Sequence, residues 1–235
     1  MEIAPGIHSL GQQMGGYVHA FLLEDGGGLT LIDTLFDTDG KRVLDYIAAI
    51  GRKPGDLKNI VVTHGHRSHL GGLAALKQAT GATVFASEQE ADIVQGERIA
   101  QPVPLLPRRP FKSYIPYQLG CALGIGAHPP CVVDRIVGDK DQVGPLEVLL
   151  SPGHSPGHLA FYWEDRKTLF AGDAVVTWPE LAPGWPAFTL NRKQHRDSLT
   201  RMARLDSEIV AVGHGDPITS RGTATVRSML SQFGM

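Results

Sequence analysis

Three histidines fall within six residues of the sequence, in the segment THGHRSH that follows an apolar run. His64, His66 and His69 are spaced closely enough for their imidazole rings to approach a common point. Neutral imidazole is a ligand that suits zinc, iron and related divalent ions. The segment therefore predicts a metal site at the end of a strand.

Further polar side chains of this kind end three later apolar runs. His154 follows LLSPG, Asp173 follows LFAG and His214 follows VAVG, so a glycine stands directly before each of them. Glycine permits a tight turn that presents the next side chain. In α/β folds, the loops beyond the strand ends converge and carry function. We therefore expect these side chains and the three clustered histidines to meet around metal.

The elements that would position these side chains alternate between strand and helix in the first half of the chain. Two apolar strands near residues 17–24 and 29–33, joined by a Gly-rich turn, predict a hairpin. The next elements are helix 40–51, strand 57–66, helix 70–81, strand 82–87 and helix 88–96. This order favours a layered α/β fold.

The second half repeats strands and helices in another order. Four strand-like runs precede a helix, a strand and a final helix, at residues 131–139, 146–154, 159–165, 167–173, 191–206, 208–216 and 223–233. Strand–helix units in both halves favour two sheets face to face with helices outside. Residues 101–130, rich in proline, basic and aromatic residues, are either a linker or, as we favour, a lid within a single domain of residues 1–235.

The order of the motifs resembles the metallo-β-lactamase superfamily, whose signature is H-x-H-x-D-H followed by a His, an Asp and a His. This sequence has LIDT and then HGHRSH, SPGH, FAGD and VGHG in that order. The resemblance implies an αββα four-layer sandwich, in which two mixed sheets face each other with helices outside. It also implies that Asp33 of LIDT supports the metal loop from behind the ligands.

Carried over by position, the resemblance implies two adjoining metal sites that share one carboxylate. The first would be held by His64, His66 and His154, the second by Ser68 (an aspartate in the signature), His69 and His214, and Asp173 would bridge both. Zinc is the expected ion, and iron or manganese would also suit these ligands. We expect one strongly bound ion and a second site that is weak or empty, because of the residue at position 68.

Ser68 stands where the signature has an aspartate. Its hydroxyl is neutral at pH 7 and a poor ligand beside a carboxylate. A second interpretation is that Ser68 caps the following helix, since Ser and Asp are both good N-caps. We expect catalysis to depend on Asp173, His214 and Ser68. Three outcomes stay open: an enzyme with an asymmetric site, a dinuclear enzyme in which water replaces the carboxylate, and a binding protein without activity.

The resemblance implies a hydrolase that uses hydroxide held by the metal, and we predict a small ester, thioester, lactone or related molecule as substrate. The alternatives are a mononuclear iron dioxygenase acting on persulfides, and a non-catalytic binding protein. A net charge of −2 predicts no broad attraction to nucleic acid or acidic membranes. No apolar run approaches the roughly 18 residues that span a bilayer. We expect a cytoplasmic protein whose oligomeric state, a homodimer included, stays open.

Four residues near these motifs have roles that the sequence leaves less determined. We interpret His158 as structural and His195 as a histidine on the surface of a helix. Trp178 and Trp185 come soon after Asp173. They either pack in the core or line a pocket, and in the second case the substrate has an apolar part.

Overall fold

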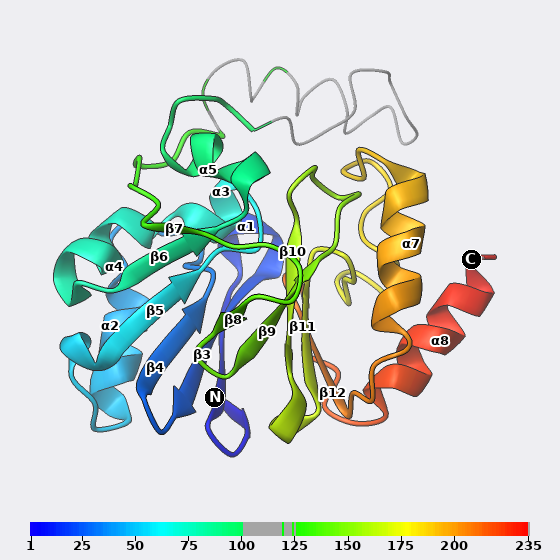
Figure 1. The fold of residues 1–235 in the computed structure, drawn as a ribbon, viewed down its shortest axis with the longest axis horizontal. Coiled ribbons are helices and arrows are strands. Elements are labelled where there is room, and N and C mark those ends of the chain that lie inside the picture. The colour runs from blue at the N-terminus through cyan, green and yellow to red at the C-terminus, as the bar shows by residue number, and fades with distance from the viewer. Residues whose placement is uncertain (101–118, 120–123, 125, 235) are drawn as a thin grey trace.

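A computed structural model describes residues 1–100, 119, 124 and 126–234. Two β-sheets lie face to face, and helices cover the outer surface of each sheet (Figure 1). The predicted αββα arrangement with two mixed sheets is confirmed. The lid predicted at residues 101–130 lies mostly outside the described residues.

The first sheet has seven strands in chain order. They are β1 (Glu2–Ala4), β2 (Ile7–Gln12), β3 (Val18–Asp25), β4 (Gly28–Ile32), β5 (Leu57–Val61), β6 (Thr83–Ala86) and β7 (Arg135–Ile136). Neighbours from β1 to β4 are antiparallel, and those from β4 to β7 are parallel. The helices of this half are α1 (Met14–Tyr17), α2 (Lys41–Ala49), α3 (Arg67–Leu70), α4 (Leu73–Thr80) and α5 (Glu88–Val94).

The second sheet has five strands in the order β12, β11, β10, β9, β8. They are β8 (Gln142–Val143), β9 (Leu146–Leu150), β10 (Leu159–Trp163), β11 (Thr168–Gly172) and β12 (Ile209–Val212). Only β12 is parallel to its neighbour, since α7 (Arg192–Met202) returns the chain before it. This helix and α8 (Gly222–Gln232) cover the outer face of the sheet, at the right of Figure 1.

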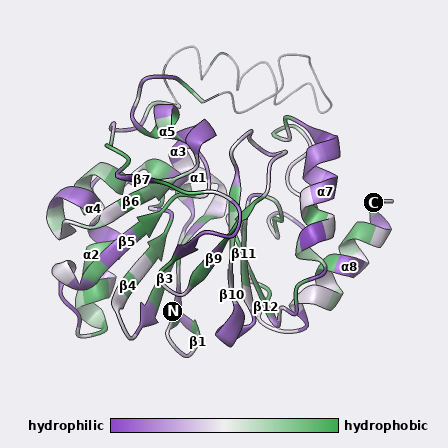
Figure 2. Ribbon diagram, in the orientation of Figure 1, coloured by the Kyte–Doolittle hydropathy of each residue, from purple (hydrophilic) through white to green (hydrophobic). Residues whose placement is uncertain are grey.

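Three apolar interfaces separate the four layers. Along β3, Val18, Ala20 and Leu22 join the core under the first group of helices, whereas Phe21 and Leu23 join the core between the sheets. This alternation follows from the two-residue period of a strand. A third core lies between the second sheet and α7 and α8. The outer helices carry both hydrophilic and hydrophobic residues (Figure 2), as helices with one buried face must.

The predicted hairpin is present as β3 and β4, and the other strands of the first half are present with shorter bounds. Two differences concern the edges of the first sheet. The sequence reading missed β1 and β2, where polar residues such as His8 and Ser9 are buried and hide the apolar pattern. The strand predicted at 131–139 is reduced to β7, a two-residue, exposed strand that joins the first sheet.

Candidate metal centre

The six predicted histidine and aspartate side chains come together where β5, β9, β11 and β12 end. They form two groups that share Asp173, and within each group the ligand atoms lie within 4.8 Å of one another. All are buried except the half-buried His66. The first group consists of His64, His66, His154 and Asp173, and the second of His69, Asp173 and His214. This is the division that the resemblance implies.

Asp33, on the turn after β4, orients two of these histidines. Its carboxylate accepts hydrogen bonds of 2.8 Å from the N–H and the hydroxyl of Thr63 and from Nδ1 of His69. A carboxylate only accepts, so His69 carries its proton on Nδ1. The Thr63 hydroxyl has donated its proton, and its oxygen therefore accepts from Nδ1 of His64 at 2.9 Å. In neutral His64 and His69, Nε2 is then left without a proton.

His214 is held in the same tautomer from the opposite side of the site. Its Nδ1 donates to the carbonyl oxygen of Gly16, at 2.8 Å, in α1 between β2 and β3. Its Nε2 lies 3.3 Å from Nε2 of His69 and 3.3 Å from Oδ2 of Asp173. These three atoms face one another in a buried space, which is unfavourable unless a proton or a metal cation lies between them. Burial lowers the pKa of His69, but Asp173 and Asp33 raise it to about 10, so without metal His69 holds that proton and a metal ion would replace it. The residues therefore fit a metal ion.

The first group offers three imidazoles and one carboxylate. Nδ1 of His66 lies 2.9 Å from Nε2 of His64 and 3.1 Å from Nε2 of His154. Oδ2 of Asp173 lies 3.4 Å from Nε2 of His154. Burial lowers the pKa of His64 and His154 well below the usual range and that of His66 to about 4. Metal ligands must be unprotonated, and these imidazoles are neutral at pH 7.

The carboxylate shared by the two groups has its own backbone support. The N–H of Asp173 donates to Nε2 of His158 at 3.1 Å, and Nδ1 of that histidine bonds to the hydroxyl of Ser151 at 2.8 Å. His158 belongs to neither group of candidate ligands. It is fully buried between two strand ends, which agrees with the structural role predicted for it.

Ser68 is the second residue of α3, and the residue at the N-cap is His66. The interpretation of Ser68 as a helix cap is therefore wrong, because the helix begins two residues earlier than a cap at Ser68 requires. The group beside Ser68 offers three candidate ligands, one fewer than the first group. This difference is what a serine in place of the signature aspartate would produce.

The interpretation of His195 as a surface residue is also wrong. It lies on the inner side of α7, is 2% exposed, and its Nε2 is 3.1 Å from the carbonyl oxygen of Pro183. Sequence reasoning also missed Thr63, although it directly precedes His64, and Glu90, whose contacts lie far away in the sequence. Thr63 could have been noticed from its position, whereas Glu90 carries no local signal.

An aromatic wall formed by Trp185, Trp178 and Phe188 stands beside the second group. The ring centroid of Trp185 is 4.4 Å from that of His214, with an angle of 37° between the planes. Trp178 and Phe188 pack against Trp185 at 5.9 and 5.6 Å. Trp178 is 45% exposed. The geometry places Trp185 beside the site, and a pocket lined by these tryptophans stays a prediction.

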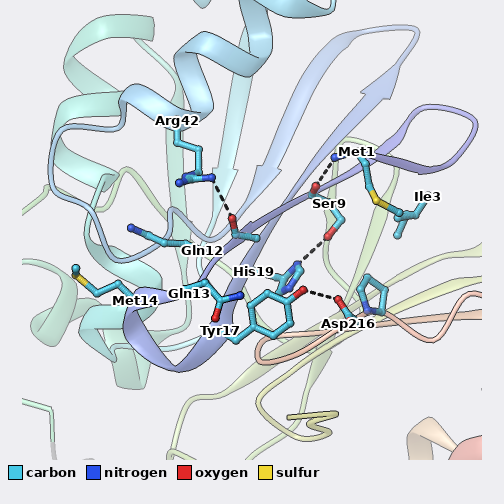
Figure 3. Close-up of a pocket in the computed structure, with 12 residues that line it drawn as sticks. Met1, Ile3, Ser9, Gln12, Gln13, Met14, Tyr17, His19, Arg42 and Asp216 are labelled. Carbon is cyan, nitrogen blue, oxygen red and sulfur yellow. Dashed lines mark hydrogen bonds between the residues drawn. The ribbon is translucent and has the colours of Figure 1, made fainter. Parts of the chain in front are cut away.

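A cavity of about 530 Å³ is lined in part by residues of β2, α1 and β3 (Figure 3). Ser9, Tyr17, His19, Arg42 and Asp216 are among its lining residues, and the Tyr17 hydroxyl donates to Asp216 at 2.6 Å. None of the candidate ligands in the described part of the chain lines it. The candidate site is therefore assigned from the convergence of the ligand atoms and not from this cavity.

Comparison with known proteins places the chain in a family. The family model described as metallo-beta-lactamase superfamily matches residues 14–214. The chain belongs to this superfamily. The matched segment contains every candidate ligand, from His64 to His214.

Three proteins illustrate what this metallo-beta-lactamase superfamily chain is similar to. It is 27% identical to the probable metallo-hydrolase YybB of Bacillus subtilis, over 86% of this chain and 82% of that protein. It is 32% identical to hydroxyacylglutathione hydrolase of Pseudomonas syringae over 75% of this chain, but spans only 54% of that enzyme. The structure of the metallo-beta-lactamase family protein TTHA1429 of Thermus thermophilus matches with a TM-score of 0.70 and 26% identity, over 99% of this chain and 79% of that one.

Family membership and the His/Asp cluster together imply that this superfamily member uses a metal ion. Its relatives support a hydrolase. Among the described residues, no helix combines the length and the apolar character needed to cross a bilayer.

Proposed function

We propose that this protein is a metal-dependent hydrolase of a small ester or thioester that carries an apolar group. The observation that carries the proposal is the set of fixed tautomers. Asp33, Thr63 and the Gly16 carbonyl hold the Nδ1 protons of three histidines, so that their Nε2 atoms face Asp173. This arrangement suits a cation. A site whose ligands are already oriented binds such a cation without reorganising.

The relatives, rather than the ligands, favour hydrolysis over redox chemistry, because imidazole and carboxylate suit zinc and iron alike. Imidazoles and a carboxylate are ligands of catalytic zinc, which at such a site acidifies a bound water and polarises the bond under attack. Asp173 lies within reach of both groups, so its carboxylate orients the two halves of the site relative to each other. The relatives named hydroxyacylglutathione hydrolase favour a thioester or ester as the bond attacked.

The aromatic wall supports a substrate with an apolar part. Trp185 lies against His214 and its indole N–H already donates to the carbonyl of Trp178, at 2.9 Å. The wall therefore offers ring faces rather than a free donor to a bound molecule. An acyl or aryl group packed there would be kept from water while its carbonyl lies toward Asp173.

Metal removal tests the proposal. Protein purified without added metal is analysed for zinc, iron and manganese, stripped with a chelator, and assayed on chromogenic esters, thioesters, lactones and β-lactams. We expect hydrolysis of an ester or thioester that falls at least about 100-fold on stripping and returns with zinc, because the barrier depends on the acidified water. A stripped protein that is as active as the loaded one, or no turnover of any substrate, would contradict the proposal.

A further inference from the structure

Glu90 is a buried carboxylate that contacts two loops of the candidate metal centre. It lies on α5 and is 2% exposed. Its Oε2 accepts a hydrogen bond from the N–H of Gly65 and its Oε1 accepts one from the N–H of Gly157, both of 2.9 Å. Gly65 separates two candidate ligands of the first group, and Gly157 lies in the loop that carries the third, His154. One side chain thus joins two loops that are far apart in the sequence.

Glycine at both positions allows α5 to approach the loops this closely. A Cβ atom on Gly65 would lie 2.6 Å from Cγ2 of Ile93 and 2.9 Å from Oε2 of Glu90. A Cβ atom on Gly157 would lie 2.3 Å from the hydroxyl oxygen of Ser87 and 2.9 Å from Cγ of Glu90. Any side chain at either position would push the helix away and break the bonds to the carboxylate.

Hydrogen bonds from the two loops allow the carboxylate of Glu90 to be buried. No ion pair joins Glu90 to a basic side chain within the part of the chain that the structure describes. Burial raises the pKa of Glu90, and the hydroxyl of Ser155 and the N–H groups of Gly157 and Gly65 oppose that rise. A buried carboxylate is unfavourable unless its oxygens have donors. Here the donors belong to the metal loops, so the contact links the acid to the site.

We propose that Glu90 is a positioning residue that holds the loops of His64, His66 and His154 at a metal-binding spacing before an ion arrives. The inference rests on the metal dependence in the proposed function. A carboxylate suits this role because both of its oxygens accept hydrogen bonds. Glutamine has nearly the same shape but would turn an NH2 group toward one of the two N–H donors.

The test is zinc affinity in Glu90→Gln, measured by competition with a chromogenic chelator. We expect the dissociation constant to rise about 10- to 100-fold, as is typical when a residue that supports metal ligands is changed. The absorption bands of the cobalt-loaded variant should also change, because the geometry of the three imidazoles changes. Glu88→Gln is the matched control, since Glu88 is exposed in the first turn of the same helix. It should leave affinity and spectrum at wild-type values.

Unchanged affinity and an unchanged cobalt spectrum in folded Glu90→Gln would overturn the inference. If the wild-type protein itself binds no metal, the proposed function fails instead. If the variant does not fold, amide hydrogen exchange in the metal-free wild-type protein tests the inference instead. The amides of Gly65 and Gly157 should exchange far more slowly than that of the exposed Gly26, and equal rates would sink the inference.

Discussion

At the scale of single residues, the candidate site is defined by which nitrogen of each histidine carries the proton. Asp33 engages the Thr63 hydroxyl and Nδ1 of His69, and the same hydroxyl then accepts from His64. One carboxylate thus leaves two Nε2 atoms free for a cation. The ligand histidines alone could adopt either tautomer, and the groups behind them decide which nitrogen faces the ion.

The serine at position 68 leads to a prediction about metal content. The first group offers four candidate ligands and the second offers three. We expect Ser68→Asp to raise the metal content from about one toward about two ions per chain, because a carboxylate binds a divalent ion far better than a neutral hydroxyl. Elemental analysis after identical purification measures the change, with Ser68→Ala as the control that adds no ligand. Equal metal content in Ser68→Asp and the wild-type protein would refute the explanation.

At the scale of elements, the short β7 strand is secured by an ion pair next to it. Nζ of Lys77 on α4 lies 2.7 Å from both carboxylate oxygens of Asp134, and the N–H of Val84 on β6 donates to Asp134. Partial burial alone would raise the pKa of Asp134, but the bonds from Lys77 and Val84 lower it. The pair thus ties the last strand of the first sheet to the helix that covers it.

This pair predicts a dependence of stability on pH. Because the pKa of Asp134 is lower in the folded than in the unfolded protein, its contribution is present above the unfolded pKa, near 4, and is lost as the pH falls through the folded pKa. We expect Asp134→Asn to lower the free energy of unfolding by under about 1 kcal/mol at pH 7, with a smaller difference below pH 4. Urea unfolding at several pH values measures it. The exposed Asp165→Asn is the control, and a difference independent of pH would contradict the argument.

At the scale of the whole molecule, the candidate site joins the two sheets. His64, His66 and His69 follow β5 of the first sheet, whereas the other three follow strands of the second: His154, Asp173 and His214. A bound ion would therefore stabilise the packing of one half of the molecule against the other. The core between the sheets supplies the rest of this contact.

This position of the site predicts that zinc stabilises the entire fold. A ligand bound only by the folded state adds about 4 kcal/mol at a concentration 1,000 times its dissociation constant. We expect zinc to raise the melting temperature of stripped protein in one cooperative transition, measured by calorimetry. His154→Ala should reduce the shift. A transition that splits in two, with only one half stabilised, would show that the site does not join the sheets.

The sequence by itself determined the fold family and the candidate ligands, because the ligands follow strand ends in short local patterns that can be read without the tertiary structure. HGHRSH, SPGH, FAGD and VGHG are legible in order along the chain. The tertiary structure alone decided what surrounds them: the Gly16 carbonyl on His214, the burial of His195 and the carboxylate of Glu90 between two loops. The partners in these contacts are separated by up to 198 positions. Only the packing of sheets and helices brings such residues together, and no local pattern records it.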